Sequence, residues 1–413
     1  MRDSDKFILR ELGKKIAEIA ALPCQQETIR LWKALNGLTP ERPMFMIDQI
    51  PWHEMDVDGE LRLQCSDDFC RGIERGIRRT LYKWKHMRDD MAIEPFVDVP
   101  KTITGMGFGI HSQEITLASD TANDVVSHSY EDLLETDEDL AKIIMPKAAL
   151  DVDATLRDEA AAHEIFDGVL NVRMKGAGPL FFAPWDEIAQ WRGVTNPLMD
   201  MMDRPNFLHR IMERLTAAHL KLLDQLEAAG LLDASNNLVH CTGAWSDELP
   251  AEGFDKERPR ARDVWTCGMA QMFSCVSPMM HEEFEMAYAK RWYARFGLVY
   301  YGCCEPLDRK VDLVRKLPHV RKISMSPWAD VDRGAEAIGR EYVFSRKPNP
   351  AMLAAESFDA GAVEKDLSDT LRACLRFGCP VELILKDIST VRYDPKRLWQ
   401  WAQSARRLVE ENI

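Results

Sequence analysis

The 413-residue chain is 46% hydrophobic and 29% charged, a composition typical of a globular protein with a large core. Its formal charge of −14 excludes a nucleic-acid-binding surface and adhesion to anionic lipid, because no basic stretch offsets the acidic excess. The apolar runs are too short to cross a bilayer and the first residues do not resemble a signal peptide, so we expect a cytoplasmic protein.

Residues 4–37 predict two amphipathic helices, and a short apolar run, PMFMIDQIP at 43–51, follows them. Similar runs that end in polar residues recur at 91–96, 169–176, 236–243, 297–304, 321–327, 341–348 and 380–387. Helical patterns separate most of these runs. Eight buried strands that alternate with helices predict an α/β fold, a (β/α)8 TIM barrel with a parallel sheet. An open doubly wound sheet is the alternative, but no GxGxxG follows an early strand.

We therefore expect a single barrel domain over 1–413, with an N-terminal helical extension at 1–40 and insertions at 97–168 and 243–280. The first insertion predicts a β-ribbon at 107–119 and an acidic helix at 129–142. Long insertions on a barrel are usually lids or partner surfaces.

Barrel enzymes place their chemistry at the C-terminal ends of the strands. The residues at the predicted strand ends are Asp48, Glu94, Lys175, His240, Cys241, Cys303, Cys304, Glu305, Ser324, Ser326, Arg346, Lys347, Lys386 and Asp387. So many ionisable groups at strand ends exceed what solvation of a surface requires. Taken singly, His240 is equally explained as a core histidine, and Glu94 and Ser324 as structural residues.

The ten cysteines form no CxxC pair, so neither a zinc ribbon nor a thioredoxin-type site is expected. In a cytosolic chain they should be reduced. The adjacent Cys303 and Cys304 are a poor geometry for a disulfide.

Several segments, in order, resemble the uroporphyrinogen decarboxylase superfamily over roughly 40–410. They are GPLFFAPWDEIAQWRG with the helix that follows (178–230), NNLVHCTGAWSDELP (236–250), YGCCEP (301–306), YVFSRKPNPAML (342–353) and LKDISTV (385–391). GCCEPLD, ISMSPWADV and FSRKPNP are similar to its corrinoid-dependent methyltransferase and O-demethylase branch. The resemblance implies a barrel fold.

The resemblance also implies an activity, either decarboxylation of a porphyrinogen or methyl transfer involving a corrinoid. The decarboxylases carry an arginine-rich signature on the first strand, where this chain reads RPMFMIDQIPWHEM with no arginine after the strand. A substrate with many carboxylates needs a cationic pocket, so methyl transfer is favoured.

Zinc-dependent members of that branch bind zinc with a His-x-Cys pair and a cysteine on the last strand. This chain has no histidine two residues before Cys303, and its last strand ends in Lys386 and Asp387. If zinc is bound, a rearranged site would use His240, Cys241, Cys303, Cys304 and Glu305, since soft sulfur ligands suit this metal.

By resemblance, we expect the protein to move a methyl group from a small donor, such as an aryl methyl ether, to the Co(I) corrinoid of a separate corrinoid protein. No Asp-x-His-x-x-Gly motif for cobalt ligation occurs in the chain itself. An acid that donates a proton to the leaving group can raise the reaction rate by about 10²–10⁴-fold. The catalytic candidates are His240, Glu305, Lys386 and Asp387. The substrate-binding candidates are Asp48, Trp52, Phe108, Phe182, Trp185, Trp245, Cys241, Cys303 and Arg346.

Three alternatives remain open. One is a zinc-dependent methylcobamide:thiol methyltransferase. Another is a uroporphyrinogen-type decarboxylase, and the last is a non-catalytic tetrapyrrole-binding barrel. The sequence does not identify the methyl donor, the direction of transfer or the oligomeric state.

Overall fold

The computed structural model describes residues 2–117, 122–123 and 126–411. It begins with the two predicted helices, α1 (Asp3–Ala20) and α2 (Pro23–Asn36). In α1 the buried residues Leu9, Leu12 and Ile16 recur at helical spacing and form the stripe that faces the core. This stripe packs against α3 (Asp68–His86) and α4 (Val152–Phe166).

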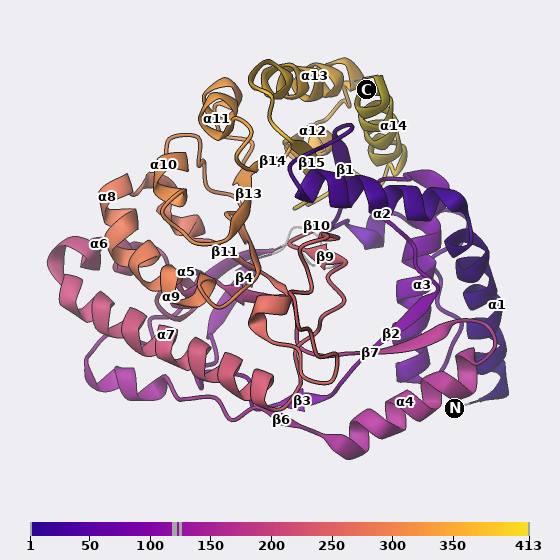
Figure 1. Cartoon of the computed structure of the whole chain (residues 1–413), viewed down its shortest axis with the longest axis horizontal. Helices are drawn as coiled ribbons and strands as arrows, with labels where there is room; N and C mark the ends of the chain where they lie inside the picture. Colours follow the sequence, from indigo (N-terminus) through magenta and orange to yellow (C-terminus); the bar gives the residue numbers. More distant parts are fainter. Residues whose placement is uncertain (1, 118–121, 124–125, 412–413) are drawn as a thin grey trace.

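The centre of the molecule is a sheet of seven parallel strands (Figure 1). Their order is β1 (Met44–Ile47), β15 (Val381–Leu385), β14 (Val343–Arg346), β13 (Val320–Met325), β12 (Leu298–Tyr301), β11 (Trp265–Gly268) and β8 (Leu180–Phe182). Helices cover its outer face, among them α5 (Pro184–Arg192), α7 (Pro205–Ala228), α9 (Ala287–Tyr293), α11 (Val331–Ile338), α13 (Ala360–Phe377) and α14 (Lys396–Glu411). The prediction of an α/β fold with a parallel sheet is confirmed.

The sheet is strongly curved. Lys386, just after β15, contacts Cys303, just after β12, although β14 and β13 lie between those two strands. Only a sheet that curls around its own inner face brings these ends together. The outer face carries alternate residues such as Phe45, Phe344 and Leu383, which belong to the main hydrophobic core.

Four strand assignments need correction. Of the predicted run 91–96, only Phe96 lies in a strand. Residues 236–243 do not add a strand to the sheet but form the short antiparallel hairpin of β9 (Leu238–Val239) and β10 (Thr242–Gly243). Strand β11 lies inside the predicted insertion 243–280, and β8 was not predicted. Both missed strands are only three or four residues long, too short for a clear period in the sequence.

The sheet ends at β1 because side chains occupy the hydrogen-bonding edge of that strand. The carboxylate of Asp90 accepts the Phe45 N–H (2.9 Å) and that of Asp89 accepts the Ile47 N–H (2.8 Å). Lys83 donates to the Ile47 carbonyl (2.7 Å). These groups replace a neighbouring strand.

Strands β2 (Phe96–Pro100) and β7 (Asn171–Lys175) pair with each other in a separate parallel sheet. Within residues 2–117, 122–123 and 126–411, no hydrogen-bonded ladder joins this pair to β1 or to β8. The eight-stranded ladder of a closed barrel is therefore not formed. The hairpin of β9 and β10 lies between the two sheets (Figure 1).

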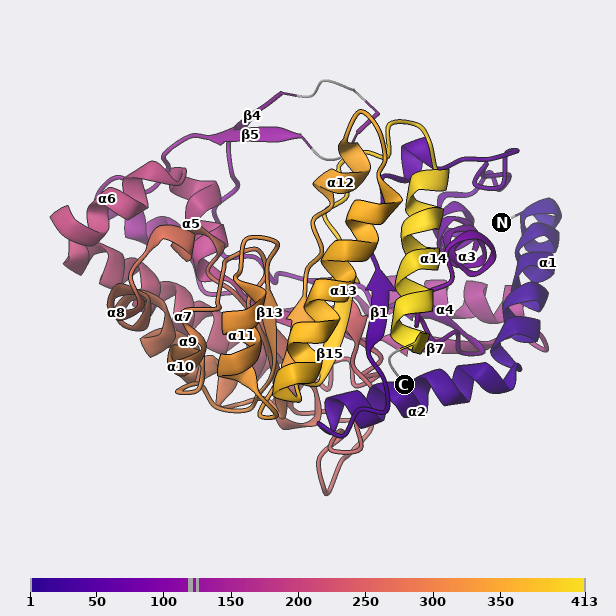
Figure 2. The ribbon, with the colours of Figure 1, turned by 90° about the horizontal axis from the view of Figure 1, so that it is seen from above.

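The first insertion forms a ribbon of β4 (Glu114–Leu117) and β5 (Ser127–Tyr130), which passes over the end of the sheet where the strands terminate (Figure 2). The predicted ribbon at 107–119 thus contains β4, while its last two residues lie outside the described residues. The predicted acidic helix at 129–142 is wrong. Residues 129–130 belong to β5, and Glu138–Lys142 forms a 3₁₀ turn.

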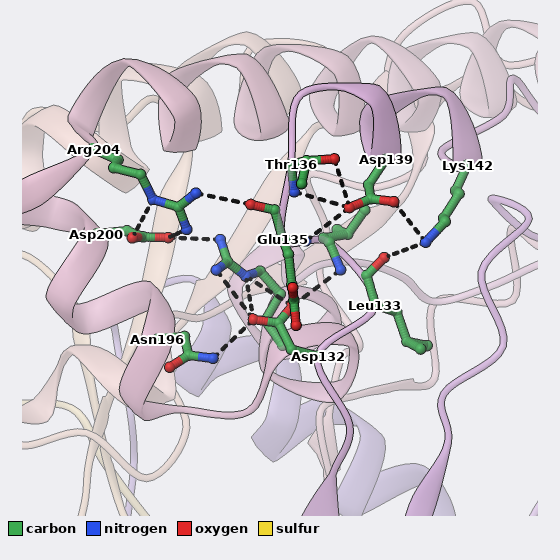
Figure 3. A network of polar contacts seen from close by, with 11 residues as sticks. Asp132, Leu133, Glu135, Thr136, Asp139, Lys142, Asn196, Asp200 and Arg204 are labelled. Atoms are coloured by element: carbon green, nitrogen blue, oxygen red, sulfur yellow. Dashed lines mark hydrogen bonds and ion pairs between the residues drawn. The ribbon is translucent and has the colours of Figure 1, made fainter.

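Ion pairs hold this acidic segment on the neighbouring helices (Figure 3). Arg192, at the end of α5, contacts Asp132 (3.2 Å) and Asp200 (2.7 Å), and Arg204 contacts Asp200 (2.8 Å). The carboxylate of Asp139 accepts the backbone N–H groups of Glu135 (3.0 Å) and Thr136 (2.9 Å). The acidic residues thus serve as local partners of arginines and turns, which explains why no helix forms.

In the described part of the chain, no helix combines the length and the apolar character that a membrane crossing requires.

Candidate active site

The inner face of the curved sheet is lined by every second residue of its strands. Three neighbouring strands present Lys322, Ser324 and Ser326 (β13), Val343, Ser345 and Lys347 (β14), and Glu382, Ile384 and Lys386 (β15). Tyr300 of β12 and Cys267 of β11 face the same interior. Polar side chains in these inward positions have no role in packing an apolar core, so they mark a candidate site.

An ion pair closes the lower part of this interior, the end at which β13 and β15 begin. Lys322 Nζ lies 2.7 Å from Glu382 Oε2, and both side chains are fully buried. Thr242 of β10 donates to the same carboxylate oxygen (2.8 Å). The indole rings of Trp32 and Trp265 cover the Lys322 ammonium at 5.0 and 5.8 Å. The pair joins β13, β15 and the hairpin at the floor of the site.

Four polar side chains meet at the upper end, where β12 and β15 terminate. Lys386 Nζ donates to Cys303 Sγ (3.1 Å) and lies 3.2 Å from Asp387 Oδ2. The Cys303 and Cys304 sulfur atoms are 3.5 Å apart, and Cys304 Sγ lies 3.7 Å from Asp387 Oδ2. Lys386 and Cys303 are buried, whereas Asp387 is exposed to solvent. This cluster brings together the polar residues of two strand ends, Cys303 and Cys304 after β12 and Lys386 and Asp387 after β15, all four of which the sequence predicted as strand-end residues.

The cluster favours a thiolate at Cys303 and an ammonium at Lys386. The hydrogen bond from the Cys304 thiol and the Lys386 charge lower the pKa of Cys303, against the opposing effect of burial. Its partner Cys304 keeps its proton, since the adjacent Cys303 raises the pKa of Cys304. Burial alone would lower the pKa of Lys386, but Cys303 and Asp387 outweigh it and raise that pKa. Lys386 is therefore a fixed positive charge.

Lys347 forms a second cationic group one strand away. Its Nζ donates to the Tyr300 hydroxyl and to Ser345 Oγ (3.2 Å), and these two hydroxyl groups are themselves 2.7 Å apart. Burial and the charge of Lys386 lower the pKa of Lys347 to about 8. The residue is mainly protonated at pH 7.

His240 and Cys241 form the tight turn between β9 and β10, with φ angles of 40° and 67°. A two-residue hairpin loop with both φ angles positive is a type I′ turn, for which Asn-Gly is preferred. Side chains with a Cβ are strained there by about 1–2 kcal/mol per residue. The turn directs His240 against the Tyr300 ring, 4.9 Å between centroids. Burial, then the charges of Lys347 and Lys386, lower the pKa of His240, so its imidazole is neutral at pH 7.

Substitution of Cys241 separates this backbone strain from any role of the thiol. Cys241→Gly should raise the free energy of unfolding by about 0.5–1 kcal/mol, since glycine accepts the left-handed conformation. Cys241→Val should lower it by more than about 1 kcal/mol, since a β-branched residue is poorly tolerated at positive φ. Urea unfolding at pH 7 measures both. Equal shifts for the two variants would contradict the assignment of strain.

Glu305 is fully buried and holds the turn that follows β12. Its carboxylate accepts the backbone N–H groups of Cys303 (2.9 Å) and Ala270 (3.2 Å). In the same turn Gly302 has φ 94°, and a Cβ there would lie 2.5 Å from Leu307. With both carboxylate oxygens bound by donors, Glu305 fits a positioning residue of the thiol pair better than the proton donor that the sequence suggested.

A second carboxylate, the half-buried Asp186 of α5, lies near this turn and was not among the predicted residues. Gln271 Nε2 donates to it (2.7 Å). Burial is the main cause that raises the pKa of Asp186 to about 6, and the negative charge of Glu305 adds to the effect.

Asp186→Asn should therefore stabilise the protein at neutral pH. Because the folded-state pKa, about 6, exceeds the model value of 3.8, protonation of Asp186 favours the native state, and this contribution is lost as the pH rises through about 6. The variant should gain up to about 3 kcal/mol at pH 7–8 and nothing below about pH 4. Urea unfolding as a function of pH measures the difference.

Asp139→Asn is the matched control for this prediction. The hydrogen bond from Lys142 lowers the pKa of Asp139 to about 2, so its substitution should destabilise the protein above about pH 4. If both variants changed the free energy of unfolding at pH 7 in the same direction, the opposite pKa shifts assigned to Asp186 and Asp139 would be contradicted.

Most of the aromatic residues predicted to bind substrate lie in the core instead. Phe182 stacks on Trp292 at 5.7 Å, and the Trp185 indole donates to the Phe284 carbonyl at 3.1 Å. Phe108 packs on His219, and Trp52 on Tyr82. The adjacent Phe181 is 44% exposed and meets His240 at 6.0 Å. Along β8, Phe182 therefore faces the core, and its neighbour Phe181 lies on the opposite face of the strand and is exposed.

Asp48 and Trp245 line a cavity of about 560 Å³ between β1, β7 and the hairpin. Burial, followed by the negative charge of Asp48, raises the pKa of Cys241 to about 12. Lys175, also at this cavity, is paired with Asp233 (3.1 Å). Glu94 lies further out and is paired with Arg173 (3.3 Å).

Arg346 points away from the interior. Its guanidinium donates to the Ser326 carbonyl (2.6 Å) and faces Asp366 of α13 (3.5 Å). Arg346 therefore anchors α13, and its inward neighbours Ser345 and Lys347 line the site. Strict alternation along β14 would have identified them.

The described residues contain no group of three or more His, Cys, Asp or Glu side chains placed to hold a metal ion. The Lys386 ammonium, 3.1 Å from Cys303 Sγ, already supplies the positive charge next to that sulfur atom. The side chains suggested as zinc ligands do not fit the metal in this arrangement. They are His240, Cys241, Cys303, Cys304 and Glu305.

No protein-family model matches the chain, and no curated protein matches it. Solved structures similar to it include a methyltransferase from Methanosarcina mazei. That structure has a TM-score of 0.50 and 12% sequence identity, and the match covers 92% of this chain and 98% of the other. At this identity the similarity concerns the fold alone.

Proposed function

We propose that the protein is a methyltransferase that moves a methyl group from a small donor, such as an aryl methyl ether, to the Co(I) corrinoid of a separate corrinoid protein. The observation that carries this proposal is the position of the Lys386 ammonium at the upper end of the interior, 3.1 Å from Cys303 Sγ and 3.2 Å from the carboxylate of solvent-exposed Asp387. The fold shared with a methyltransferase supports it. We infer that the curved sheet and the β2–β7 pair together represent an opened form of the (β/α)8 barrel.

The reaction places a specific demand on this site. When the bond between the methyl carbon and the donor oxygen breaks, the electron pair stays on oxygen, which becomes an anion. The corrinoid, when docked, supplies the nucleophile, so this chain must position the donor and stabilise the anion.

Lys386 is suited to stabilise that anion. An ammonium has three donors, and Cys303 and Asp387 account for two, with no other partner among the described residues. The third can point to the leaving oxygen. A preorganised donor of this kind contributes about 10²–10³-fold to the rate. Neutral His240 and the exposed ring of Phe181 flank the position where the donor would bind.

The partner would approach from the upper side. The ribbon of β4 and β5 passes over this end of the sheet (Figure 2). Ile115 and Leu117 of β4 and Trp328, which follows β13, are exposed apolar residues, and Trp328 is 76% exposed. Exposed apolar residues near one opening favour a protein contact there.

The tetrapyrrole decarboxylase is the weaker candidate. Arg346, the arginine at the end of β14, faces α13 and is not directed at the interior. A substrate with several carboxylates would therefore meet Lys322, Lys347 and Lys386 of the inner wall but not this arginine.

Incubation of the protein with free Co(I) cobalamin and a panel of methyl ethers, methylamines and methyl thioethers tests the proposal. Methylation of cobalt, followed by its absorption spectrum, should depend on the protein for at least one donor. Iodomethane, which methylates Co(I) without a catalyst, is the positive control. If no donor in the panel gives protein-dependent methylation, with free cobalamin or with corrinoid proteins, the proposal is refuted.

A further inference from the structure

Lys347 is a buried ammonium with only neutral partners. Its side chain is 3% exposed, and its contacts are the hydroxyl groups of Tyr300 and Ser345 and the face of the Tyr300 ring at 4.9 Å. No carboxylate of the described residues lies within 4 Å of its nitrogen, whereas the buried Lys83, Lys322 and Lys386 each have one at 2.9, 2.7 and 3.2 Å. Its positive charge is therefore not balanced locally.

An unbalanced buried charge is costly, and such groups usually meet an opposite charge in the functional state. Burial and the nearby Lys386 lower the pKa of Lys347, while Glu382 opposes this effect only in part. The protein thus keeps an uncompensated positive charge at the centre of its inner wall. An anionic ligand would compensate that charge.

Two polar groups near Lys347 have no hydrogen-bond partner among the described residues. Ser326 Oγ and His240 Nε2 are both buried without a hydrogen bond in the described structure. Met325 pairs with Arg346 across β13 and β14, so Ser326 and Lys347 occupy the next inward positions on neighbouring strands. His240 packs on Tyr300, which Lys347 contacts. Three elements thus present potential donors toward one region.

The remaining buried lysine shows that this arrangement is not a general property of the fold. Lys310 also has no carboxylate within 4 Å among the described residues, but it lies on the outer side of β12. Its nitrogen contacts two good acceptors, the Phe273 carbonyl (2.8 Å) and His281 Nδ1 (3.1 Å). Lys310 therefore needs no ligand.

We propose that Lys347, Ser326 and His240 form a subsite for the carboxylate of a small organic anion, so that the methyl donor is a carboxylate-bearing compound. Lys347 supplies the charge, and the serine hydroxyl and the neutral imidazole supply directed hydrogen bonds. The identification of the anion as part of the methyl donor rests on the proposed function. The binding of a carboxylate does not.

Calorimetric titration with benzoate and with its neutral isostere benzamide tests the subsite. Benzoate should bind the wild-type protein at least about tenfold more tightly than benzamide, as expected for a charge-assisted contact. Lys347→Met should weaken benzoate about 10- to 100-fold and leave benzamide unchanged. The variant should fold, since methionine has a similar volume to lysine and its introduction removes a buried charge.

Lys310→Met is the matched control, because it removes a buried ammonium outside the interior and should leave benzoate binding unchanged. Ser326→Ala should weaken benzoate about threefold or more. Three outcomes would overturn the subsite. They are the absence of saturable benzoate binding, equal affinity of the wild-type protein for the two ligands, and an equal loss of affinity for both ligands in Lys347→Met. Failure of the methylation assay with intact benzoate binding would refute only the proposed function. Methylation by neutral ethers without benzoate binding would refute only the subsite.

Discussion

Lys386→Met is expected to lower the rate constant of protein-dependent cobalamin methylation by about 10²–10³-fold in a single turnover. The reason is the loss of the fixed charge that stabilises the leaving oxygen. The same substitution removes the cation next to Cys303 and should raise the pKa of that thiol. Alkylation by iodoacetamide at pH 7, followed by mass spectrometry of the Cys303 peptide, should then be slower.

Lys386→Arg distinguishes charge from proton transfer. Arginine keeps the positive charge but does not give up a proton at accessible pH. If Lys386 acts as a fixed charge, this variant should keep much more activity than Lys386→Met. Equal loss in the two variants would show that charge alone is not the contribution. Lys365→Met, a change at an exposed position of α13, is the control and should be silent.

Glu382→Leu is expected to lower the free energy of unfolding by about 3–5 kcal/mol. The substitution leaves the Lys322 ammonium buried without its partner, 2.7 Å away in the native protein, and removes the acceptor of the Thr242 hydroxyl. Thr242 belongs to the hairpin that carries His240, so the lower part of the site should loosen at the same time. Urea unfolding at pH 7 measures the loss.

The double variant Lys322→Met and Glu382→Leu should recover most of that stability, because it removes both charges and places apolar side chains beside Trp32 and Trp265. Asp369→Ala breaks the exposed Lys365–Asp369 pair and should change the free energy of unfolding far less than Glu382→Leu, because solvent screens this pair. A double variant as unstable as Glu382→Leu alone would argue against a penalty from the unpaired lysine.

The sequence alone determined the alternation of short buried strands with amphipathic helices, since both depend on local periodicity. Runs such as Leu298–Tyr301 and Val381–Leu385 are apolar at every position or nearly so, which is the pattern of a sheet buried on both faces. The polar residues directly after them, including Cys303 and Lys386, could be predicted as site candidates because parallel strands all end on one side.

The tertiary structure alone decided which of these residues meet. Cys303 and Lys386 are 83 positions apart, and only the curvature of the sheet brings them to 3.1 Å. It also decided that Phe181 rather than Phe182 faces the interior, because short strands leave the register open. The sequence 236–243 reads as a strand, but its central pair, His240 and Cys241, adopts a strained turn that only the surrounding packing can impose. The local sequence around Asp89 and Asp90 likewise does not predict their role. Their carboxylates occupy the edge of β1 at which a closed barrel would continue.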